Sequence, residues 1–420
     1  MKKSRMLTVS LAAFMTAGLL GGCGSEEKET TILENTTAGG FDEYSLTTMR
    51  KVKSIEDLVN KYFYYEQDDA KREEAFYDGI MKGLDDPYSV YYTPEEMKRM
   101  EEDDSGEFVG IGASVSKNTE NGQIYVVKPL KDSPAEAAGL VSGDVFVEVD
   151  GLTITTDMEL EDVVNHIRGT EGSVAKLKMY REGEKDFLHF EIPRKLIQNI
   201  TCEYELLSNG FGYIEVEQFI DNTAEQFYKA VDDLVAQGAK ALIVDMRNNP
   251  GGFTVVATNM VDYLLEDTAV PKGQGSDKAG VLLEIKDKNG KIIEKDVCQD
   301  GHSVDLPMAV LVNDYTASSS EIFSGAMRDY GKAILVGEKT YGKGIVQQVF
   351  SLNDGSGVKL TIASYFLPAG DNIHKVGIEP DVEVELPTEL RRKANLLHSE
   401  DTQLQKAITE LGGDPLPEGE

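Results

Sequence analysis

Cysteine, histidine and basic residues are scarce in this chain of 420 residues, and each shortage excludes a class of protein. Three cysteines are too few for a disulfide framework, and no group of Cys and His has the spacing of metal ligands. The 42 Lys and Arg against 74 Asp and Glu give a formal net charge of -32, which argues against nucleic acid because phosphate binding needs a basic surface. Catalysis that depends on histidine has few candidates: His166, His189, His302, His374 and His398.

Apolar residues are plentiful enough to build hydrophobic cores. They make up 40% of the chain, which excludes disorder over its whole length. A chain of this length has room for about two or three domains.

The N-terminus has the pattern of a bacterial export signal. Basic residues at Lys2, Lys3 and Arg5 precede a mostly apolar stretch from 7 to 20, which is too short to span a bilayer. Leu-Gly-Gly-Cys at 20–23 resembles a lipobox. We therefore expect a lipoprotein signal peptide over 1–22, lipid on Cys23, and an extracytoplasmic protein anchored to the bacterial cell membrane. An ordinary secretion signal with an incidental cysteine is the alternative.

The remaining chain divides into five segments by pattern. Residues 23–40 are polar and without periodicity, which is typical of a flexible tether. Helical spacing predicts a helical N-terminal segment over 41–105, with a helix start at Thr93-Pro94. Short β-like runs separated by glycine turns occupy 106–195, and alternating strands and helices occupy 196–385. Residues 386–420 predict a helical tail, with a charged helix over 389–397 and a polar end.

The segment 106–195 resembles a PDZ domain in the circularly permuted form of bacterial proteases. The resemblance depends on Pro-Ala-Glu-Ala-Ala-Gly-Leu at 134–140 and on Gly-Asp at 143–144. We expect backbone N–H groups of Gly110, Ile111, Gly112 and Ala113 to receive the C-terminal carboxylate of a peptide. Alternatively, these glycines form only a tight turn beside an empty or regulatory groove.

Arg168 follows the helix predicted near residues 160–167 in this segment. It is a candidate for reporting ligand occupancy to the neighbouring domain. A solvated arginine at a helix end is an equally good interpretation.

A serine-rich junction is the first candidate for chemistry. The strand predicted at 308–313 leads into Thr-Ala-Ser-Ser-Ser-Glu at 316–321, and a helix follows. A serine at such a junction lies beside backbone N–H groups without intrahelical partners, and these can stabilise an oxyanion. Ser318 with Glu321 also fits a capping box, which needs no catalysis.

Two glycine-containing segments add further candidates. Gly251 and Gly252 follow a buried strand that ends at Asp245, so their N–H groups lie at the carboxyl end of the sheet. Lys343 lies in a turn between glycines, and Gln347 follows it. A lysine acts as a base only if burial lowers its pKa from about 10.4 to about 7–8, which corresponds to about 4 kcal/mol. By itself, Lys343 fits a surface lysine better.

Together these segments resemble the carboxyl-terminal processing peptidases, or tail-specific proteases. The matching stretches lie at 85–96, 245–252, 316–321, 337–347 and 377–381, in the family's order, and the resemblance covers about 45–385. It implies that Ser318 is the nucleophile, Lys343 its general base and Gln347 the support of the lysine. It further implies an oxyanion hole from the Ser319 N–H and an N–H of Gly251 or Gly252.

The resemblance also sets the expected fold and partners. We expect an α/β multidomain protein with a helical N-terminal segment, a permuted PDZ domain (a β-barrel with helices) and a crotonase-like α/β protease core. It would cleave exported proteins near their C-termini without metal or cofactor. A regulator at the PDZ domain and a homodimer are further expectations. The sequence departs from many relatives at Asn249-Pro250 and at 371–375.

Two rival functions remain open at this point. One is an inactive, lipid-anchored PDZ scaffold. The other is a Ser/His hydrolase that uses His302 or His374, although no motif pairs either histidine with a serine.

Overall fold

A computed structural model describes residues 42–118, 121–391 and 396–420, without the side chains of 42–45. The predicted signal peptide, the lipid site Cys23 and the tether therefore lie outside the described residues. Among the described residues, no helix has the length and apolar character needed to cross a bilayer. The chain divides after Tyr91 into two units, and each is described separately.

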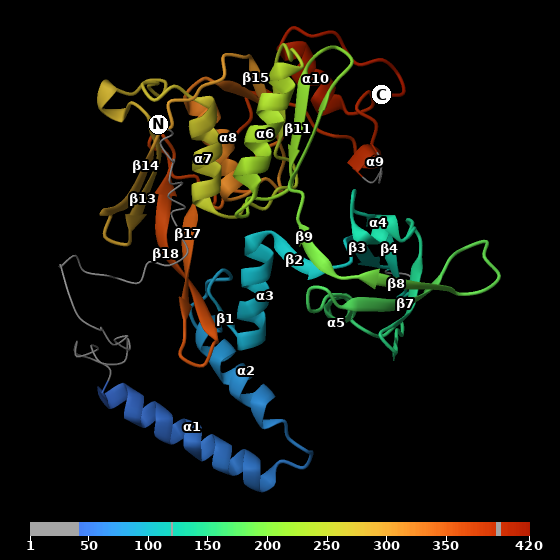
Figure 1. Cartoon of the computed structure of the whole chain (residues 1–420). Helices are drawn as coiled ribbons and strands as arrows, with labels where there is room; N and C mark the ends of the chain where they lie inside the picture. The colour runs from blue at the N-terminus through green and yellow to red at the C-terminus, as the bar shows by residue number, and fades with distance from the viewer. Residues whose placement is uncertain (1–41, 119–120, 392–395) are drawn as a thin grey trace, which may run out of the picture. The chain divides into compact units, whose positions relative to one another are not determined.

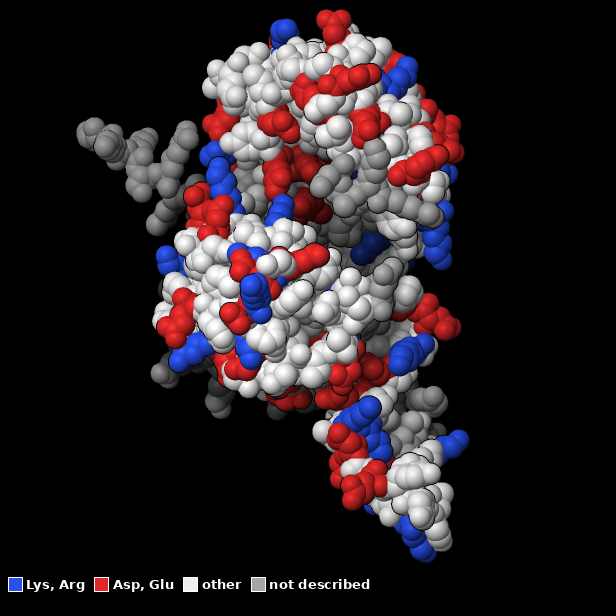
Figure 2. Space-filling view, turned by 90° about the vertical axis from the view of Figure 1, so that its right-hand side faces the viewer, with Lys and Arg blue, Asp and Glu red and all other residues white. Residues whose placement is uncertain are grey.

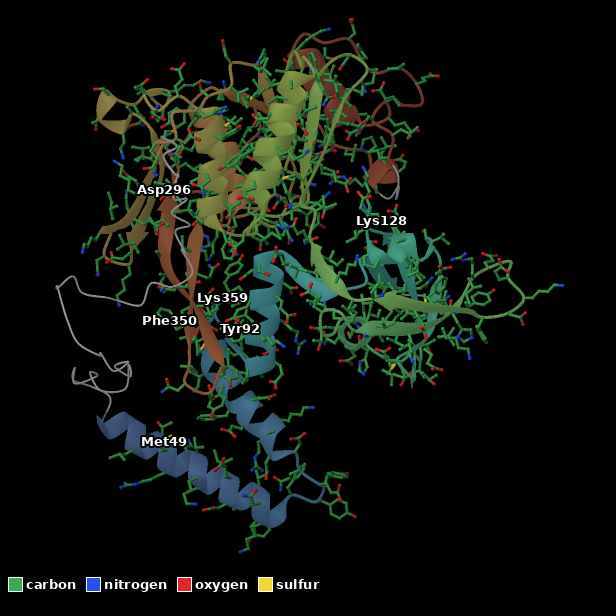
Figure 3. All side chains as sticks on the ribbon, in the orientation of Figure 1. Met49, Tyr92, Lys128, Asp296, Phe350 and Lys359 are labelled. Atoms are coloured by element: carbon green, nitrogen blue, oxygen red, sulfur yellow. The ribbon has the colours of Figure 1, made fainter. Side chains whose placement is uncertain are left out.

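The N-terminal unit consists mainly of two helices, α1 (Asp42–Tyr62) and α2 (Asp69–Lys82). Asp68 begins α2 by accepting the N–H of Lys71 on its side chain, and Gly83 ends it. Both helices expose large apolar side chains, Met49 in Figure 3 among them. The predicted helical character of this segment is confirmed.

The second unit begins at the end of β1 (Val90–Tyr92), which leads into α3 (Pro94–Ser105). Thr93 and Glu96 form a capping box at the start of α3, as the Thr-Pro pair predicts. The Tyr92 hydroxyl accepts a hydrogen bond from Lys359 Nζ at 2.6 Å, and both residues are labelled in Figure 3. A ribbon of β2 (Glu107–Gly110) and β9 (Lys195–Gln198) flanks the next module at both of its chain ends.

That module is a small β-sheet with helices. Its strands are β3 (Ala113–Lys117), β4 (Ile124–Pro129), β5 (Val145–Val149), β6 (Leu152–Thr153), β7 (Val174–Tyr180) and β8 (Leu188–Pro193). Alternate residues of β7 are buried, because one face of the sheet packs on a core that includes Val126 and Val149. The helices are α4 (Pro134–Ala137) and α5 (Leu160–Ile167).

A six-stranded sheet forms the centre of the C-terminal domain. Its order is β10 (Cys202–Leu206), β11 (Gly212–Val216), β12 (Leu242–Asp245), β15 (Met308–Val312), β16 (Ala333–Gly337) and β19 (Val382–Glu383). All neighbours pair in parallel except β10 with β11. Strands β12 and β15 are buried along their whole length, because helices cover both faces.

The helices covering this sheet divide its core into two clusters. On one face lie α6 (Thr223–Ala236), α7 (Thr254–Leu264) and α8 (Ser319–Asp329), which are adjacent in Figure 1. On the other face lies α10 (Thr402–Glu410), whose Leu404, Ala407 and Ile408 are fully buried. Each such leucine or isoleucine contributes about 1.5–3 kcal/mol by leaving water.

A second, antiparallel sheet lies beside the helices. It contains β14 (Ile292–Val297), β13 (Val281–Asp287), β18 (Gly357–Phe366) and β17 (Ile345–Ser351), with the 3-10 turn η2 (Ser276–Lys278) before β13. Tyr365 of β18 is fully buried, and its hydroxyl donates to the Ser318 carbonyl at 3.2 Å. This contact connects the second sheet to the serine-rich junction.

The C-terminal segment differs from its sequence-based expectation. The charged helix predicted over 389–397 appears as α9 (Thr388–Arg391), and 392–395 lie outside the described residues. The end expected to be only polar contains the buried helix α10. Its apolar residues are few and separated by polar ones, so the face they form was not recognised.

Acidic side chains are spread over the face seen in Figure 2 rather than confined to one element, in line with the net charge of -32.

Candidate active site

Ser318 lies between β15 and α8, at the predicted strand-to-helix junction. Its backbone has φ 59° and ψ -120°, a left-handed conformation that residues with a side chain rarely adopt. Strain of this kind gathers at functional sites, and nucleophilic serines of hydrolases lie on similarly sharp strand-to-helix turns. Because α8 begins at the next residue, its unpaired N–H groups lie close to Ser318.

The two following serines have structural hydrogen bonds. The Ser319 hydroxyl donates to the Gly252 carbonyl at 2.7 Å, and the Ser320 hydroxyl donates to the Asn249 carbonyl at 2.9 Å. Both bonds tie the start of α8 to the segment after β12. This distribution favours Ser318 as the reactive member of the three.

Residues 246–252, here called the glycine loop, lie directly against the serine junction. A Cβ added to Gly251 would lie 2.7 Å from the Ser318 Cβ and 2.9 Å from the Ser319 nitrogen. Gly251 has φ 103° and Gly252 has φ 144°, so both positions require glycine. The Gly251 N–H donates to the Asn249 side chain at 2.9 Å. In the described part of the chain, neither the Gly252 N–H nor the Ser319 N–H has a hydrogen-bond acceptor.

Glu321 connects the serine junction to the lysine-containing loop, residues 340–344. Its Oε2 accepts the N–H of Ser318 at 2.9 Å and the N–H of Lys343 at 2.8 Å. Its Oε1 accepts the Thr340 hydroxyl at 2.5 Å and the Gly342 N–H at 2.8 Å. One buried carboxylate therefore holds both predicted catalytic residues by their backbones.

Burial and hydrogen bonding shift the pKa of Glu321 in opposite directions. Its side chain is fully buried, and burial raises its pKa above the ordinary value. The hydrogen bonds from Thr340, Lys343, Gly342 and Ser318 favour the carboxylate and offset part of this effect. These four donors therefore stabilise the carboxylate of Glu321 in the protein interior.

The capping-box alternative explains only part of this arrangement. Glu321 does accept the N–H of Ser318, as a capping residue would. The same carboxylate also receives donors from 340–343, which a simple helix cap does not need. Capping and connection of the two loops are thus both properties of Glu321.

The lysine loop is held in place by close backbone contacts. A Cβ on Gly342 would lie 2.7 Å from the Gly377 nitrogen, and a Cβ on Gly344 would lie 2.6 Å from the His374 nitrogen. The Tyr341 N–H donates to the Thr316 carbonyl at 3.0 Å, beside the serine junction. The glycines around Lys343 therefore permit tight packing rather than flexibility. Lys343 itself is partly buried.

Gln347 lies on β17, opposite Thr361 of β18. Its Nε2 donates to the Thr361 hydroxyl at 3.4 Å. The catalytic roles of Gln347, Lys343 and Ser318 stay predictions.

The PDZ-like module has a groove at the predicted peptide site. The groove encloses about 90 Å³, and its lining includes all four predicted residues together with Arg168. The lining residues are Phe108, Gly110, Ile111, Gly112, Ala113, Val115, Val164, Ile167 and Arg168. Peptide capture by their N–H groups stays a prediction.

Arg168 is less exposed than the solvated interpretation requires. Its guanidinium lies over the Phe108 ring, 5.0 Å from the centroid, and 3.5 Å from both Glu102 and Asp103 of α3. The side chain thus connects the groove to α3. Its function in reporting occupancy stays a prediction.

The two histidines of the rival hydrolase are placed differently. The His302 ring stacks on Tyr263 with centroids 3.8 Å apart, and its Nδ1 lies 2.5 Å from the Tyr263 carbonyl oxygen. The His374 Nδ1 is buried and has no hydrogen-bond partner among the described residues. His374 lies beside Gly344, so it is the histidine of this pair that adjoins the lysine loop.

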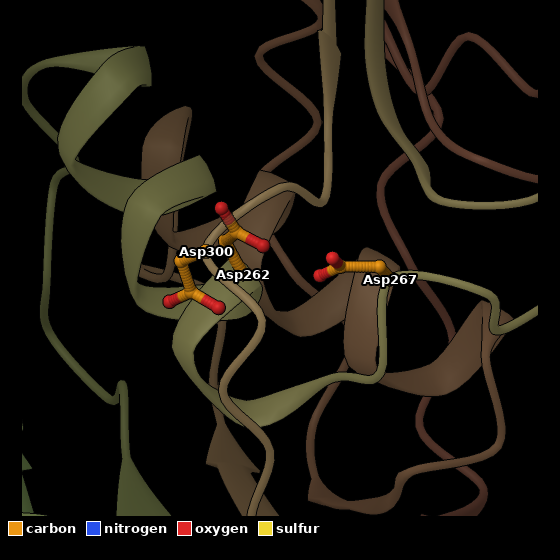
Figure 4. A group of neighbouring side chains, drawn as sticks. All are labelled: Asp262, Asp267 and Asp300. Carbon is orange, nitrogen blue, oxygen red and sulfur yellow. The ribbon is translucent and has the colours of Figure 1, made fainter.

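Three carboxylates that the sequence analysis did not single out lie together near the C-terminal end of α7. Asp262, Asp267 and Asp300 have oxygens within 4.8 Å of one another (Figure 4). Their oxygens accept the N–H groups of Gln299, Gly301 and His302 respectively. These bonds account for the cluster as a loop-stabilising feature. No sequence signal marks it, because Asp300 is more than thirty residues from the other two in the chain.

Comparison with protein families identifies both domains. The model of peptidase family S41 matches residues 210–384, and the model of the PDZ domain matches residues 109–192. The first covers the central sheet from β11 to β19, with Ser318 and Lys343. The second covers the module of β3 to β8.

Curated relatives match most of the chain. A probable CtpA-like serine protease of Staphylococcus epidermidis is 36% identical over 360 residues, which is 85% of this chain and 70% of the relative. A protein with the same description from Staphylococcus aureus is 36% identical over 356 residues, covering 85% and 68%. The solved structure of a photosystem II D1 C-terminal processing protease is 30% identical, covers 75% of this chain and 84% of that chain, and has a TM-score of 0.44.

Proposed function

Because the chain belongs to peptidase family S41 as a CtpA-like C-terminal processing serine protease with a PDZ domain, we propose that Ser318 and Lys343 form its catalytic dyad. One observation carries this proposal. A single oxygen of Glu321 accepts the backbone N–H groups of both residues, so the two are close in space although a helix and a strand separate them in sequence.

The proposed reaction is acyl transfer through an ester of Ser318. Neutral Lys343 removes the hydroxyl proton, and the serine oxygen attacks the carbonyl carbon of the scissile peptide. The lysine then gives this proton to the leaving amine. Water, deprotonated by Lys343, hydrolyses the ester and restores the serine. Gln347, held by Thr361, orients the lysine amine.

The tetrahedral intermediate needs N–H donors for its oxyanion. We assign Gly252 and Ser319 this function, because their N–H groups lack acceptors and adjoin the serine. Gly251 is not the donor, since its N–H is bonded to Asn249. Its part is to let the glycine loop approach Ser318. Loss of one such donor lowers kcat by about 10²–10³-fold in other serine proteases.

The PDZ groove gives the enzyme a means to select substrates. It would receive the C-terminal carboxylate of an exported protein, with the peptide added as a strand beside Gly112 to Val115. Arg168 would change its position when a peptide binds, and its ion pairs with Glu102 and Asp103 would pass this change on to α3. A regulatory protein with a free C-terminus would use the same groove.

The N-terminal pattern supports a location outside the cytoplasmic membrane, with lipid on Cys23. The exposed apolar faces of α1 and α2 are compatible with the expected homodimer. The lipid anchor is tested by labelling cells that express the wild-type protein or Cys23→Ala with a radioactive fatty acid. The homodimer is tested by light scattering of the purified protein. Absence of label on the wild-type protein contradicts the anchor, and a monomer contradicts the dimer.

Catalysis is tested by incubating the mature chain with a loosely folded protein that ends in an apolar C-terminus. Ser318→Ala and Lys343→Ala should abolish cleavage, while circular dichroism confirms their folding. Lys339→Ala is the matched control, because this lysine lies in the same segment but forms a surface ion pair with Glu379. It should retain full activity.

The inactive-scaffold rival makes the opposite prediction. A serine-directed fluorophosphonate should modify wild type on Ser318 and leave Lys343→Ala much less modified, because the serine then lacks its base. No modification of wild type, with binding of C-terminal peptides intact, would favour the scaffold. Equal cleavage by wild type and both variants would assign the activity to another group.

A further inference from the structure

Arg247 of the glycine loop is fixed by two separate parts of the chain. Its guanidinium binds Asp245, at the end of β12, through Nε at 2.9 and 3.0 Å. It also binds Asp401 at 2.7 Å and the Gln403 side-chain oxygen at 2.9 Å. The last two residues belong to the start of α10, beyond the S41 match at 210–384.

The two carboxylate oxygens of Asp401 have different partners. Oδ1 accepts the N–H groups of Gln403 and Leu404, both at 3.0 Å, and so caps α10. Oδ2 pairs with Arg247. Asp401 and Arg247 are both buried, with 5% and 11% of their side chains exposed, so solvent screens this pair little.

The charges around Arg247 stabilise its guanidinium between Asp245 and Asp401, an arrangement here called the clamp. Burial disfavours its cation, yet the carboxylates of Asp245 and Asp401 outweigh burial and raise its pKa above the ordinary value. Asp245 is itself held by the Tyr213 hydroxyl at 2.7 Å. The arginine therefore remains charged and keeps its orientation.

The other end of the glycine loop is anchored to the serine junction. The Asn249 carbonyl accepts the Ala317 N–H at 3.1 Å and the Ser320 hydroxyl at 2.9 Å. Between the two anchors, Asn248 has a positive φ of 61° and exchanges hydrogen bonds with the Asn313 side chain. A strained residue between two anchors keeps its conformation only while both anchors hold.

We infer that Asp401 is a positioning residue for the active site, which acts through Arg247 to hold the glycine loop against Ser318. The inference rests on the proposed function of this loop in supplying an oxyanion donor. The C-terminal helix is then part of the catalytic apparatus and not only a cover for the sheet. Displacement of the glycine loop by about 1 Å is enough to cost about 10²-fold in rate.

The variant that tests this inference most directly is Asp401→Asn. Asparagine has the size of aspartate and is as good a helix cap, so α10 should stay in place. It removes the charge that pairs with Arg247, and the remaining Arg247–Asp245 pair is neutral overall. Lys406→Asn is the matched control, because Lys406 is a half-exposed residue of the same helix whose ion pair, with Glu410, does not involve the glycine loop.

We expect Asp401→Asn to lower kcat on a peptide substrate about tenfold, with KM changed less than twofold. The affinity for a peptide aldehyde, whose adduct with Ser318 bears the oxyanion, should fall by the same factor. Lys406→Asn should match wild type in all three quantities. Unchanged kcat and aldehyde affinity in Asp401→Asn overturn the inference. A fall in kcat that equals the fraction of protein unfolded by circular dichroism also overturns it, because unfolding lowers the apparent kcat at constant KM.

A second background separates positioning from simple stability. Arg247→Lys keeps the pair with Asp245 but cannot span to Asp401 as the forked guanidinium does. In this background Asp401→Asn should have no further effect on kcat. A further tenfold loss would show that Asp401 acts by another route and would overturn the inference.

Hydrogen exchange makes the test independent of catalysis. Asp401→Asn should speed exchange in peptides that cover 246–252 and leave those of 402–410 as in wild type. Faster exchange in the glycine loop of an enzyme without any activity would contradict the proposed function but support the clamp. Unchanged exchange in that loop would contradict the clamp whatever the activity.

Discussion

Replacement of Glu321 by glutamine removes a buried carboxylate that accepts hydrogen bonds from both the serine junction and the lysine loop. Each carboxylate oxygen accepts a pair of donors: Ser318 and Lys343 on Oε2, and Thr340 and Gly342 on Oε1. A glutamine has an NH₂ group in place of one oxygen. In either orientation, this group therefore faces two donors and can accept from neither.

The magnitude follows from the donors left unpaired. A buried donor without a partner costs about 1–3 kcal/mol, so two cost about 2–6 kcal/mol. Part of this is offset, because burial disfavours the glutamate ion and raises its pKa. We expect the protein to lose about 2–4 kcal/mol of stability at neutral pH. A shift of about 1 Å between Ser318 and Lys343 would lower kcat about 10²-fold.

The assay compares kcat, KM and thermal unfolding for Glu321→Gln and for Glu379→Gln. The control removes a carboxylate from an exposed ion pair with Lys339, which is worth at most about 1 kcal/mol. Activity is measured below the unfolding temperature, so that the fraction of folded enzyme is equal. Wild-type kcat in folded Glu321→Gln would refute the reasoning, because the two loops would then keep their positions without this carboxylate.

Three further predictions concern other parts of the second unit. Gly251→Ala should lower kcat at least 10²-fold in a cleavage assay, since its Cβ would lie 2.7 Å from that of Ser318; normal activity would contradict the proposed approach of the glycine loop. Burial, Asp221 and Asp103 raise the pKa of Asp104 to about 6, whereas Lys359 lowers it. Because the folded state binds this proton more tightly than the unfolded state, stability should fall as pH rises from about 4 to 6, and Asp104→Asn should flatten this part of the curve in thermal melts. His374→Ala should retain cleavage if Lys343 is the base, whereas loss of activity with intact folding would favour the Ser/His rival.

The sequence was informative wherever function depends on short contiguous motifs. The Thr-Pro helix start at 93–94, the β-strand character of 106–195 and the buried strands that end before the glycine loop and the serine junction were predicted correctly. Such features depend on local periodicity and on capping or turn chemistry. The family resemblance, confirmed by the S41 and PDZ matches, followed from the same motifs.

The burial of helix α10 could not be predicted from the local sequence pattern. Its apolar residues Leu404, Ala407 and Ile408 are interrupted by polar ones, and Gln403 and Asp401 are also buried. These polar groups are tolerated because Arg247 and Val384 supply their partners. Those partners lie far away in the chain, so no window of sequence around 401–410 contains the reason for the burial.

The amino-acid sequence by itself determined the family, the domain types and the candidates Ser318 and Lys343. It could not distinguish a cap from a catalytic junction, because Ser318 and Glu321 satisfy both patterns, and it could not choose between Gly251 and Gly252. Only the tertiary structure shows that Glu321 also accepts donors from 340–343 and that the Gly251 N–H is bonded to Asn249, and our proposals on both points depend on these contacts. Hydrogen-bond partners are set by distance and direction in space, and sequence separation carries no information about either.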